Sequence, residues 1–243
     1  MSIILPDIPL PPERINPRFL LIYGPRKVGK TTTLAKLESN LIVDLEEGTD
    51  YVSALKIKCK TLEEFKLLCI ELCKHKPRKY KYVTLDTIDV IQDWALLRAC
   101  ELYKQSPVGK NFNIEANNYT VEGLPNGAGY LWIRKAFNEI LQLTYNLADN
   151  IIYVGHVKDS SIQSLGTTVV PKELDLLGKC KDIMCQACDT VGHMFRDSSN
   201  KLGINFVSTQ NVLCSSRVSH VTGKIIYFDK DKGWEQIFLP EGK

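Results

Sequence analysis

The sequence predicts an α/β fold with a mostly parallel sheet flanked by helices and an antiparallel extension near the C-terminus. Three observations support this prediction. Short apolar runs alternate with segments of helical spacing, the first of these runs stops at a glycine-rich turn, and the C-terminal part changes to β-rich segments joined by turn residues. Parallel strands buried on both faces are typically near-continuous apolar runs, as these are.

Each element is predicted from its own pattern. Short apolar runs predict buried strands over 19–23, 41–45, 80–85 and 151–155. Apolar residues on one side predict helices over 30–37, 62–73, 90–103, 130–147 and 174–187. Antiparallel strands are expected over 190–196, 202–208 and 224–228, with a turn at 197–200. Two polar segments, 104–129 and 158–171, are expected to be long loops, which in compact domains are usually functional or mobile.

The composition is that of one ordinary globular domain. The chain has 243 residues, 44% of them hydrophobic, and no internal repeat or linker divides it. We expect residues 1–18, with prolines from Pro6 to Pro17, to form an extended lead-in, and residues 19–243 to form a single domain. The longest apolar stretches are far shorter than the roughly 20 residues that cross a bilayer, so no membrane association is expected. Eight scattered cysteines favour a reducing cytoplasm, and a formal charge of +3 permits a nucleic-acid partner without requiring one.

Residues 24–31 match the pattern G-x-x-x-x-G-K-[ST], and they stand between a predicted buried strand and a predicted helix. In this pattern backbone N–H groups surround the phosphates, the lysine adds positive charge near the β and γ oxygens, and the threonine hydroxyl binds Mg²⁺. The flanking elements disfavour a chance glycine turn. We therefore expect ATP and Mg²⁺ as ligands, with phosphate contacts from Gly24, Pro25, Arg26, Lys27, Val28, Gly29, Lys30, Thr31 and Thr32.

Two acidic positions would complete such a site. Asp86 ends a predicted buried strand, where a carboxylate can orient Mg²⁺ through water, although an aspartate there could also cap the next helix. Asp89 and Asp93 are expected on the surface of that helix. Glutamates 46 and 47 follow the second strand beside a glycine and could activate the attacking water; the alternative is an exposed acidic turn. Glu46 is preferred over Glu47.

Together these motifs resemble the RecA-like core ATPases and, among them, the phage-encoded Sak-type single-strand annealing ATPases. The resemblance covers nearly the whole chain, and only its first motif is highly specific alone. It rests on residues 24–31, 44–48, 85–87, 125–130, 155–158 and 214–220. It implies a RecA-like core, hydrolysis of ATP, and the host cytoplasm if the protein is phage-encoded. It also makes Glu46 similar to the water-activating glutamate and His156 similar to the polar γ-phosphate sensor. Without the resemblance, His156 would be taken as a structural histidine.

The resemblance further implies partners. It assigns single-stranded DNA to segments 104–129 and 158–172, a homo-oligomer in ring or filament form, and an accompanying single-strand binding protein. By the same resemblance, Arg217 and His220 lie where basic groups contact the ATP of a neighbouring subunit. The alternative is that they belong to an ordinary hairpin surface. The groups available for phosphates and bases are Lys104, Lys110, Lys158, Lys172, Phe112 and Tyr119. The acids Glu115, Glu122, Asp159 and Glu173 offset that charge, so composition alone fits a flexible surface equally well.

Other features are given simpler interpretations. The basic run 74–81 is expected to be a solvated connection at the edge opposite the glycine-rich turn, because ligands bind at the carboxyl ends of strands. A zinc site is not expected, since the spacing matches no common zinc module; the residues considered are Cys180, Cys185, Cys188 and His193. Two other functions stay open: a phosphotransferase acting on a small molecule, and a module that binds nucleotide without hydrolysing it.

Overall fold

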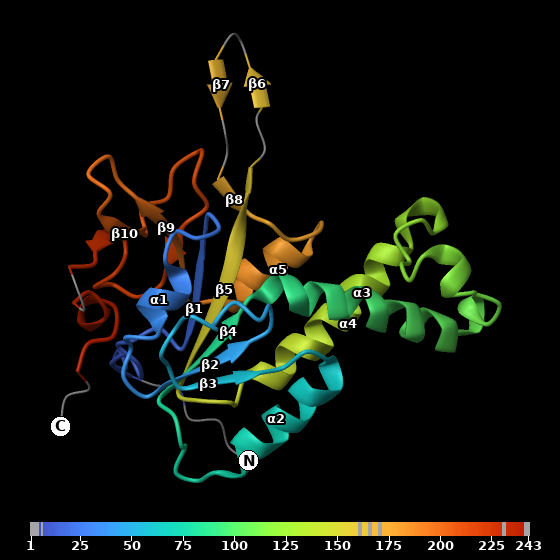
Figure 1. Cartoon of the computed structure of the whole chain (residues 1–243), viewed down its shortest axis with the longest axis horizontal. Helices are drawn as coiled ribbons and strands as arrows, with labels where there is room; N and C mark the ends of the chain where they lie inside the picture. The colour runs from blue at the N-terminus through green and yellow to red at the C-terminus, as the bar shows by residue number, and fades with distance from the viewer. Residues whose placement is uncertain are drawn as a thin grey trace.

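The computed structural model describes residues 5, 7–159, 162–164, 167–169, 172–229 and 232–240. A sheet of ten strands forms its centre, in the order β12-β10-β9-β1-β5-β4-β2-β3, with β11 paired to β9 and β8 paired to β5 (Figure 1). The strands are β1 (Phe19–Gly24), β2 (Asn40–Asp44), β3 (Lys56–Lys58), β4 (Tyr82–Asp86), β5 (Asn150–Asp159), β6 (Ile162–Ser164), β7 (Thr167–Val169), β8 (Lys172–Leu174), β9 (Thr190–Arg196), β10 (Leu202–Asn205), β11 (Ser215–Ser216) and β12 (Ile225–Tyr227). The helices are α1 (Lys30–Leu34), α2 (Leu62–Lys74), α3 (Ile88–Gln105), α4 (Gly129–Thr144) and α5 (Cys180–Ala187).

The predicted fold class is confirmed. Strands β3, β2, β4, β5, β1 and β9 pair in parallel along the sheet, and β10 and β12 extend it in antiparallel fashion. The central strands are apolar because both of their faces are covered. The five residues of β1 that follow Phe19 are all buried, and β2 and β4 are buried throughout.

Alternate residues of β1 enter two different cores. Leu21 packs in the core formed with α2, α3, α4 and α5, whereas Ile22 packs in the core formed with α1 and the C-terminal segment. In the second core the Trp234 indole N–H donates a 2.9 Å hydrogen bond to the carbonyl oxygen of Thr33. Residues near the end of the chain therefore hold the short helix α1 against the sheet.

Three element predictions need correction. The helix expected over 30–37 ends at Leu34, and Lys36 and Leu37 continue in tighter turns that bond three residues back. Strand β3 was not predicted, since its three residues are exposed and too few to show a pattern. The helix expected over 174–187 is α5 alone, because Leu174 ends strand β8 and Gly178 adopts a φ of 50° before the helix begins.

The segment expected as a long loop over 104–129 is largely folded. Helix α3 runs to Gln105, and three short 3-10 turns follow at Pro107–Gly109, Glu115–Asn117 and Pro125–Gly127. Val121 is fully buried, and a side chain at Gly129 would overlap the Val121 carbonyl oxygen. The segment lies at the far end of the paired helices α3 and α4, well away from the sheet (Figure 1). It is a structured tip of a helical arm.

The second expected loop also contains strands. Strand β5 continues to Asp159, β6 pairs with β7 in antiparallel register, and β8 returns beside β5. The pair β6–β7 projects beyond the end of β5 (Figure 1). Part of the predicted loop, residues 160, 161, 165, 166, 170 and 171, lies outside the described residues. Among the described residues, no helix combines the length and the hydropathy that crossing a bilayer requires.

Candidate functional site

The carboxyl ends of four parallel strands meet at one edge of the sheet. Asp44 of β2 pairs with Asp86 of β4, and Gly24 of β1 pairs with His156 of β5. Asp86 in turn is in register with Val154 of β5. Because parallel strands end at the same edge, residues as distant in the chain as Gly24 and His156 are brought together here. This is the edge from which the glycine-rich turn leaves β1.

The turn from Gly24 to Thr31 is tightly packed. A side chain at Gly24 would overlap the Met194 carbonyl oxygen of β9, so only glycine fits there. Lys27 and Gly29 adopt positive φ angles of 61° and 116°, which turn the backbone before α1. The Lys30 side chain is buried, and its ammonium donates 3.0 Å hydrogen bonds to the carbonyl oxygens of Gly24 and Pro25. Burial lowers the pKa of Lys30, an effect that the Asp86 carboxylate opposes.

Thr31 and Asp86 are in direct contact. The Thr31 hydroxyl donates a 2.5 Å hydrogen bond to Oδ2 of Asp86, across the space between α1 and β4. Burial raises the pKa of Asp86, and the bond from Thr31 works in the opposite direction. A hydroxyl and a carboxylate are the hard oxygen ligands that Mg²⁺ prefers. Their adjacency beside Lys30 fits a magnesium ion bound next to a phosphate group.

Glu46 and Glu47 lie in different surroundings. Glu46 Oε1 accepts a 2.8 Å hydrogen bond from the Thr87 hydroxyl, which keeps its carboxylate beside the end of β4. Glu47 instead forms an ion pair with Lys60. The turn that carries both is fixed by Asp44, whose carboxylate accepts bonds from the Gly48 N–H, the Thr49 N–H and the Thr49 hydroxyl. The preferred residue of the pair, Glu46, is the one that lines the site.

His156 joins the same group from β5. Its Nδ1 lies 2.7 Å from Oδ2 of Asp89 and 3.8 Å from Oε1 of Glu46. The ligand-type atoms of Glu46, Asp89 and His156 all lie within 4.8 Å of one another. The expectation that Asp89 is a helix-surface residue is therefore wrong, because the first turn of α3 aims it at His156. Asp93, one turn further along, is exposed as expected.

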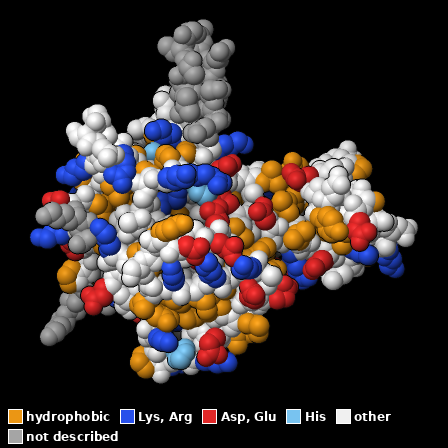
Figure 2. Space-filling view, viewed as in Figure 1, with side chains coloured by type: hydrophobic (Ala, Val, Ile, Leu, Met, Phe, Trp, Pro, Cys, Tyr) orange, Lys and Arg blue, Asp and Glu red, His pale blue; other side chains and the backbone are white. Residues whose placement is uncertain are grey.

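Lys30, Thr31, Asp86, Glu46 and His156 line one pocket of about 510 Å³. Its lining residues are Arg26, Lys27, Gly29, Lys30, Thr31, Thr32, Asp44, Glu46, Gly48, Val52, Asp86, Thr87 and His156. Figure 2 shows basic and acidic side chains gathered close together near the centre of the face that it presents. Cations and anions facing one cavity suit a phosphorylated ligand that is bound together with a metal ion.

Arg196 contacts the glycine-rich turn, and the sequence patterns did not indicate it. Its guanidinium donates from Nε to the Val28 carbonyl oxygen at 3.1 Å and from Nη1 to the Asn200 carbonyl oxygen at 2.8 Å. An arginine at the end of a β-strand usually looks like a surface residue. Only the parallel pairing of β1 and β9 reveals that it braces the turn.

Arg217 and His220 are not part of this pocket. The Arg217 N–H bonds to the carbonyl oxygen of Asp189, just before β9, and Ser216 pairs with Thr190 at the start of that strand. His220 Nε2 lies 3.0 Å from the Ile237 carbonyl oxygen. Both residues are therefore near the edge of the sheet opposite the glycine-rich turn of their own chain.

The two segments assigned to DNA lie far apart within one chain. The tip of the α3–α4 arm and the β6–β7 pair point in different directions (Figure 1). Phe112 packs edge-on against Tyr103 with ring centroids 5.1 Å apart, while the Tyr119 side chain is exposed. At the base of β6–β7, Lys158 and Lys172 are exposed.

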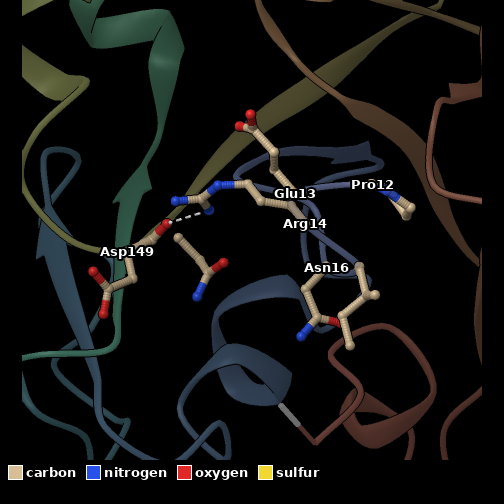
Figure 3. Close-up of a pocket in the computed structure, with 7 residues that line it drawn as sticks. Pro12, Glu13, Arg14, Asn16 and Asp149 are labelled. Carbon is tan, nitrogen blue, oxygen red and sulfur yellow. Dashed lines mark hydrogen bonds between the residues drawn. The ribbon is translucent and has the colours of Figure 1, made fainter. Parts of the chain in front are cut away.

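A second pocket lies at the opposite edge of the sheet (Figure 3). It measures about 520 Å³, and its lining residues are Pro12, Glu13, Arg14, Ile15, Asn16, Asp149 and Asn150. Arg14 reaches across it to the Asp149 carbonyl oxygen at 3.3 Å. The basic run 74–81 lies at the same edge, where Arg78 pairs with Asp149. Asn150 begins β5, whereas His156, which lines the first pocket, lies toward the other end of the same strand. The two pockets are therefore at opposite edges of the sheet.

The model of the AAA domain family matches residues 16–235. Among the solved structures that match, the crystal structure of the RadB recombinase has 14% sequence identity and a TM-score of 0.45, and the alignment covers 88% of each chain. No curated protein matches this chain.

Proposed function

Since the chain belongs to the AAA domain family, we propose that it binds ATP with Mg²⁺ and hydrolyses the ATP to ADP and phosphate. The observation that carries this proposal is the meeting of Lys30, the Thr31–Asp86 pair and Glu46 around one pocket. Each supplies a different requirement of phosphoryl transfer: a cation for the phosphates, ligands for a metal, and a base for water.

The residues divide the chemistry among them. The backbone N–H groups of residues 24–31 and the Lys30 ammonium bind the phosphate oxygens. When bound, Mg²⁺ neutralises negative charge on those oxygens, and Thr31 and Asp86 hold it. Glu46 accepts a proton from a water molecule as the water oxygen bonds to the γ-phosphorus. The bond from that phosphorus to the β–γ bridging oxygen breaks, and its electron pair leaves with ADP.

Lys30→Ala tests the site. Because this ammonium is buried beside the pocket, its removal should abolish MgATP binding measured by calorimetry and phosphate release measured by a coupled assay. Lys66→Ala on α2 is the matched control, since Lys66 is exposed and lies outside the pocket. Wild-type protein that is well folded and takes up no nucleotide in the presence of Mg²⁺ would refute the proposal.

We propose further that the ATPase acts on single-stranded DNA, as the Sak-type resemblance implies. Support comes from the base of β6–β7, where Lys158 and Lys172 are exposed while Glu173 is paired with Lys181 at 2.7 Å. That ion pair lowers the negative charge that Glu173 contributes beside the two lysines. Single-stranded oligonucleotide should raise ATP turnover, and the effect should weaken with salt. Turnover that is independent of DNA at all salt concentrations would refute this part.

A homo-oligomer, as ring or filament, follows from the same proposal, with a single-strand binding protein as a further partner. Arg217 and His220 could then reach the pocket only of a neighbouring subunit. Mixing Arg217→Ala subunits with Lys30→Ala subunits should restore part of the lost turnover, because some interfaces would then combine an intact Lys30 with an intact Arg217. Arg98→Ala on α3 is the control, since its guanidinium pairs with Glu101 and Glu139 instead. No recovery in the mixture would exclude a role for Arg217 in a neighbour's site.

A further inference from the structure

His156 has two carboxylates beside one ring nitrogen. Nδ1 lies 2.7 Å from Asp89 and 3.8 Å from Glu46, so Asp89 makes the hydrogen bond and Glu46 is a near second acceptor. The three residues come from separate elements, namely β5, α3 and the turn after β2. His156 is buried with 7% of its surface exposed. The ring therefore has few orientations available, and its partners decide which one it adopts.

The chemistry of the 2.7 Å contact fixes the ring proton. A carboxylate oxygen accepts, so Nδ1 must carry the hydrogen that Asp89 receives. Nε2 is then the ring nitrogen left for another group in the pocket. Glu46, meanwhile, keeps its own 2.8 Å bond from the Thr87 hydroxyl.

We propose that Asp89 is a positioning residue that acts through His156, an inference that rests on the hydrolysis proposed for this site. By holding the Nδ1 hydrogen, Asp89 directs Nε2 toward the bound phosphates and keeps the imidazole from bonding to Glu46. Without Asp89, the nearest acceptor for that hydrogen is Glu46, only 3.8 Å away in the present arrangement. A Glu46 carboxylate engaged by His156 is a poorer acceptor for the proton of water.

A structural role for Asp89 makes a different prediction. Asp89 lies in the first turn of α3, where an acidic side chain stabilises the helix through the macrodipole. Its removal would then lower thermal stability and would affect turnover independently of His156. The two roles are separated by a double-mutant cycle, because a residue that acts only through His156 has no further effect once His156 is gone.

The cycle uses Asp89→Ala, His156→Ala and the double variant, with MgATP affinity, kcat and melting temperature measured for each. We expect Asp89→Ala to lower kcat about tenfold, within the range of coupled neighbours, with MgATP affinity nearly unchanged. The double variant should be no slower than His156→Ala. Asp89→Asn, which keeps an acceptor oxygen, should retain more activity and serves if the alanine variant folds poorly. Asp182→Ala, which removes an acidic residue from the first turn of α5 and lies outside the pocket, is the matched control and should behave as wild type.

Three results would overturn the inference: wild-type kcat in Asp89→Ala, losses that multiply in the double variant, or a His156 ring without a proton on Nδ1 in ¹⁵N NMR of the wild-type protein. The NMR measurement needs no turnover. A protein with the Nδ1 proton but no ATP hydrolysis would refute the proposed function alone. A wild-type enzyme that hydrolyses ATP but shows multiplicative losses would refute the role of Asp89 alone.

Discussion

Glu46 accepts a hydrogen bond from the Thr87 hydroxyl across the ends of β2 and β4, so the residue that follows Asp86 holds the carboxylate to which we assign water activation. This bond links the two acidic positions of the site. The neighbouring Glu47 has a different partner: it pairs with Lys60, which lies outside the pocket.

Glu46→Gln should bind MgATP normally and hydrolyse it slowly. The amide keeps an oxygen for the Thr87 hydroxyl but cannot accept a proton from water, so kcat should fall by about 10²- to 10⁴-fold. Single-turnover phosphate release and calorimetry measure the two effects separately. Glu47→Gln is the matched control and should retain wild-type kcat. A fall in Glu47→Gln with normal turnover in Glu46→Gln would transfer the role to Glu47.

Gly24→Ala should destabilise the fold. The added methyl would overlap the Met194 carbonyl oxygen, and overpacking of this kind costs about 1–3 kcal/mol of unfolding free energy. Gly48→Ala is the control, because no atom lies within 4 Å of the position its methyl would take, and its effect should stay within about 0.5 kcal/mol. Urea unfolding of both variants gives the comparison. Equal unfolding free energies for the two variants would show that β9 can shift to accommodate the added methyl group.

His193 should make the protein sensitive to mild acid. Burial lowers its pKa from 6.5 to about 4, with Lys172 and Lys30 acting in the same direction. The unfolded chain therefore binds a proton that the folded chain does not, and stability falls as the pH drops from about 6.5 to about 4. Its Nε2 also has no hydrogen-bond partner among the described residues. Between these two pH values the melting temperature of His193→Leu should fall less than that of the wild-type protein. An equal fall would mean that other groups cause the acid sensitivity.

Arg196→Ala should weaken ATP binding more than it slows hydrolysis. The side chain braces the Val28 carbonyl and touches no group assigned to the reaction, so KM should rise by up to about tenfold with a smaller change in kcat. Lys201→Ala is the control, because Lys201 follows the turn at 197–200 and its side chain packs over Tyr227. Steady-state kinetics over a range of ATP concentrations distinguishes the two parameters. Unchanged KM would mean that the turn keeps its shape without this brace.

The sequence predicted those parts of the fold and site that depend on local pattern. The turn at 24–31, Asp86 and Glu46 all follow buried strands, and the parallel arrangement of those strands explains their convergence. Asp89 was expected on a helix surface and Arg196 was not predicted at all, because their partners, His156 and Val28, are distant in the chain. Strand β3 was not predicted because three exposed residues show no periodicity of apolar side chains.

The bond between Trp234 and Thr33 bears on how the protein emerges from the ribosome. The glycine-rich turn at 24–31 is translated early. Its neighbours are translated later: β1 pairs with β5 and β9, and α1 is held by Trp234, some 200 residues further along the chain. Contacts of such long sequence separation form slowly. A nascent chain that does not yet include Trp234 therefore lacks the hydrogen bond that holds α1 against the sheet.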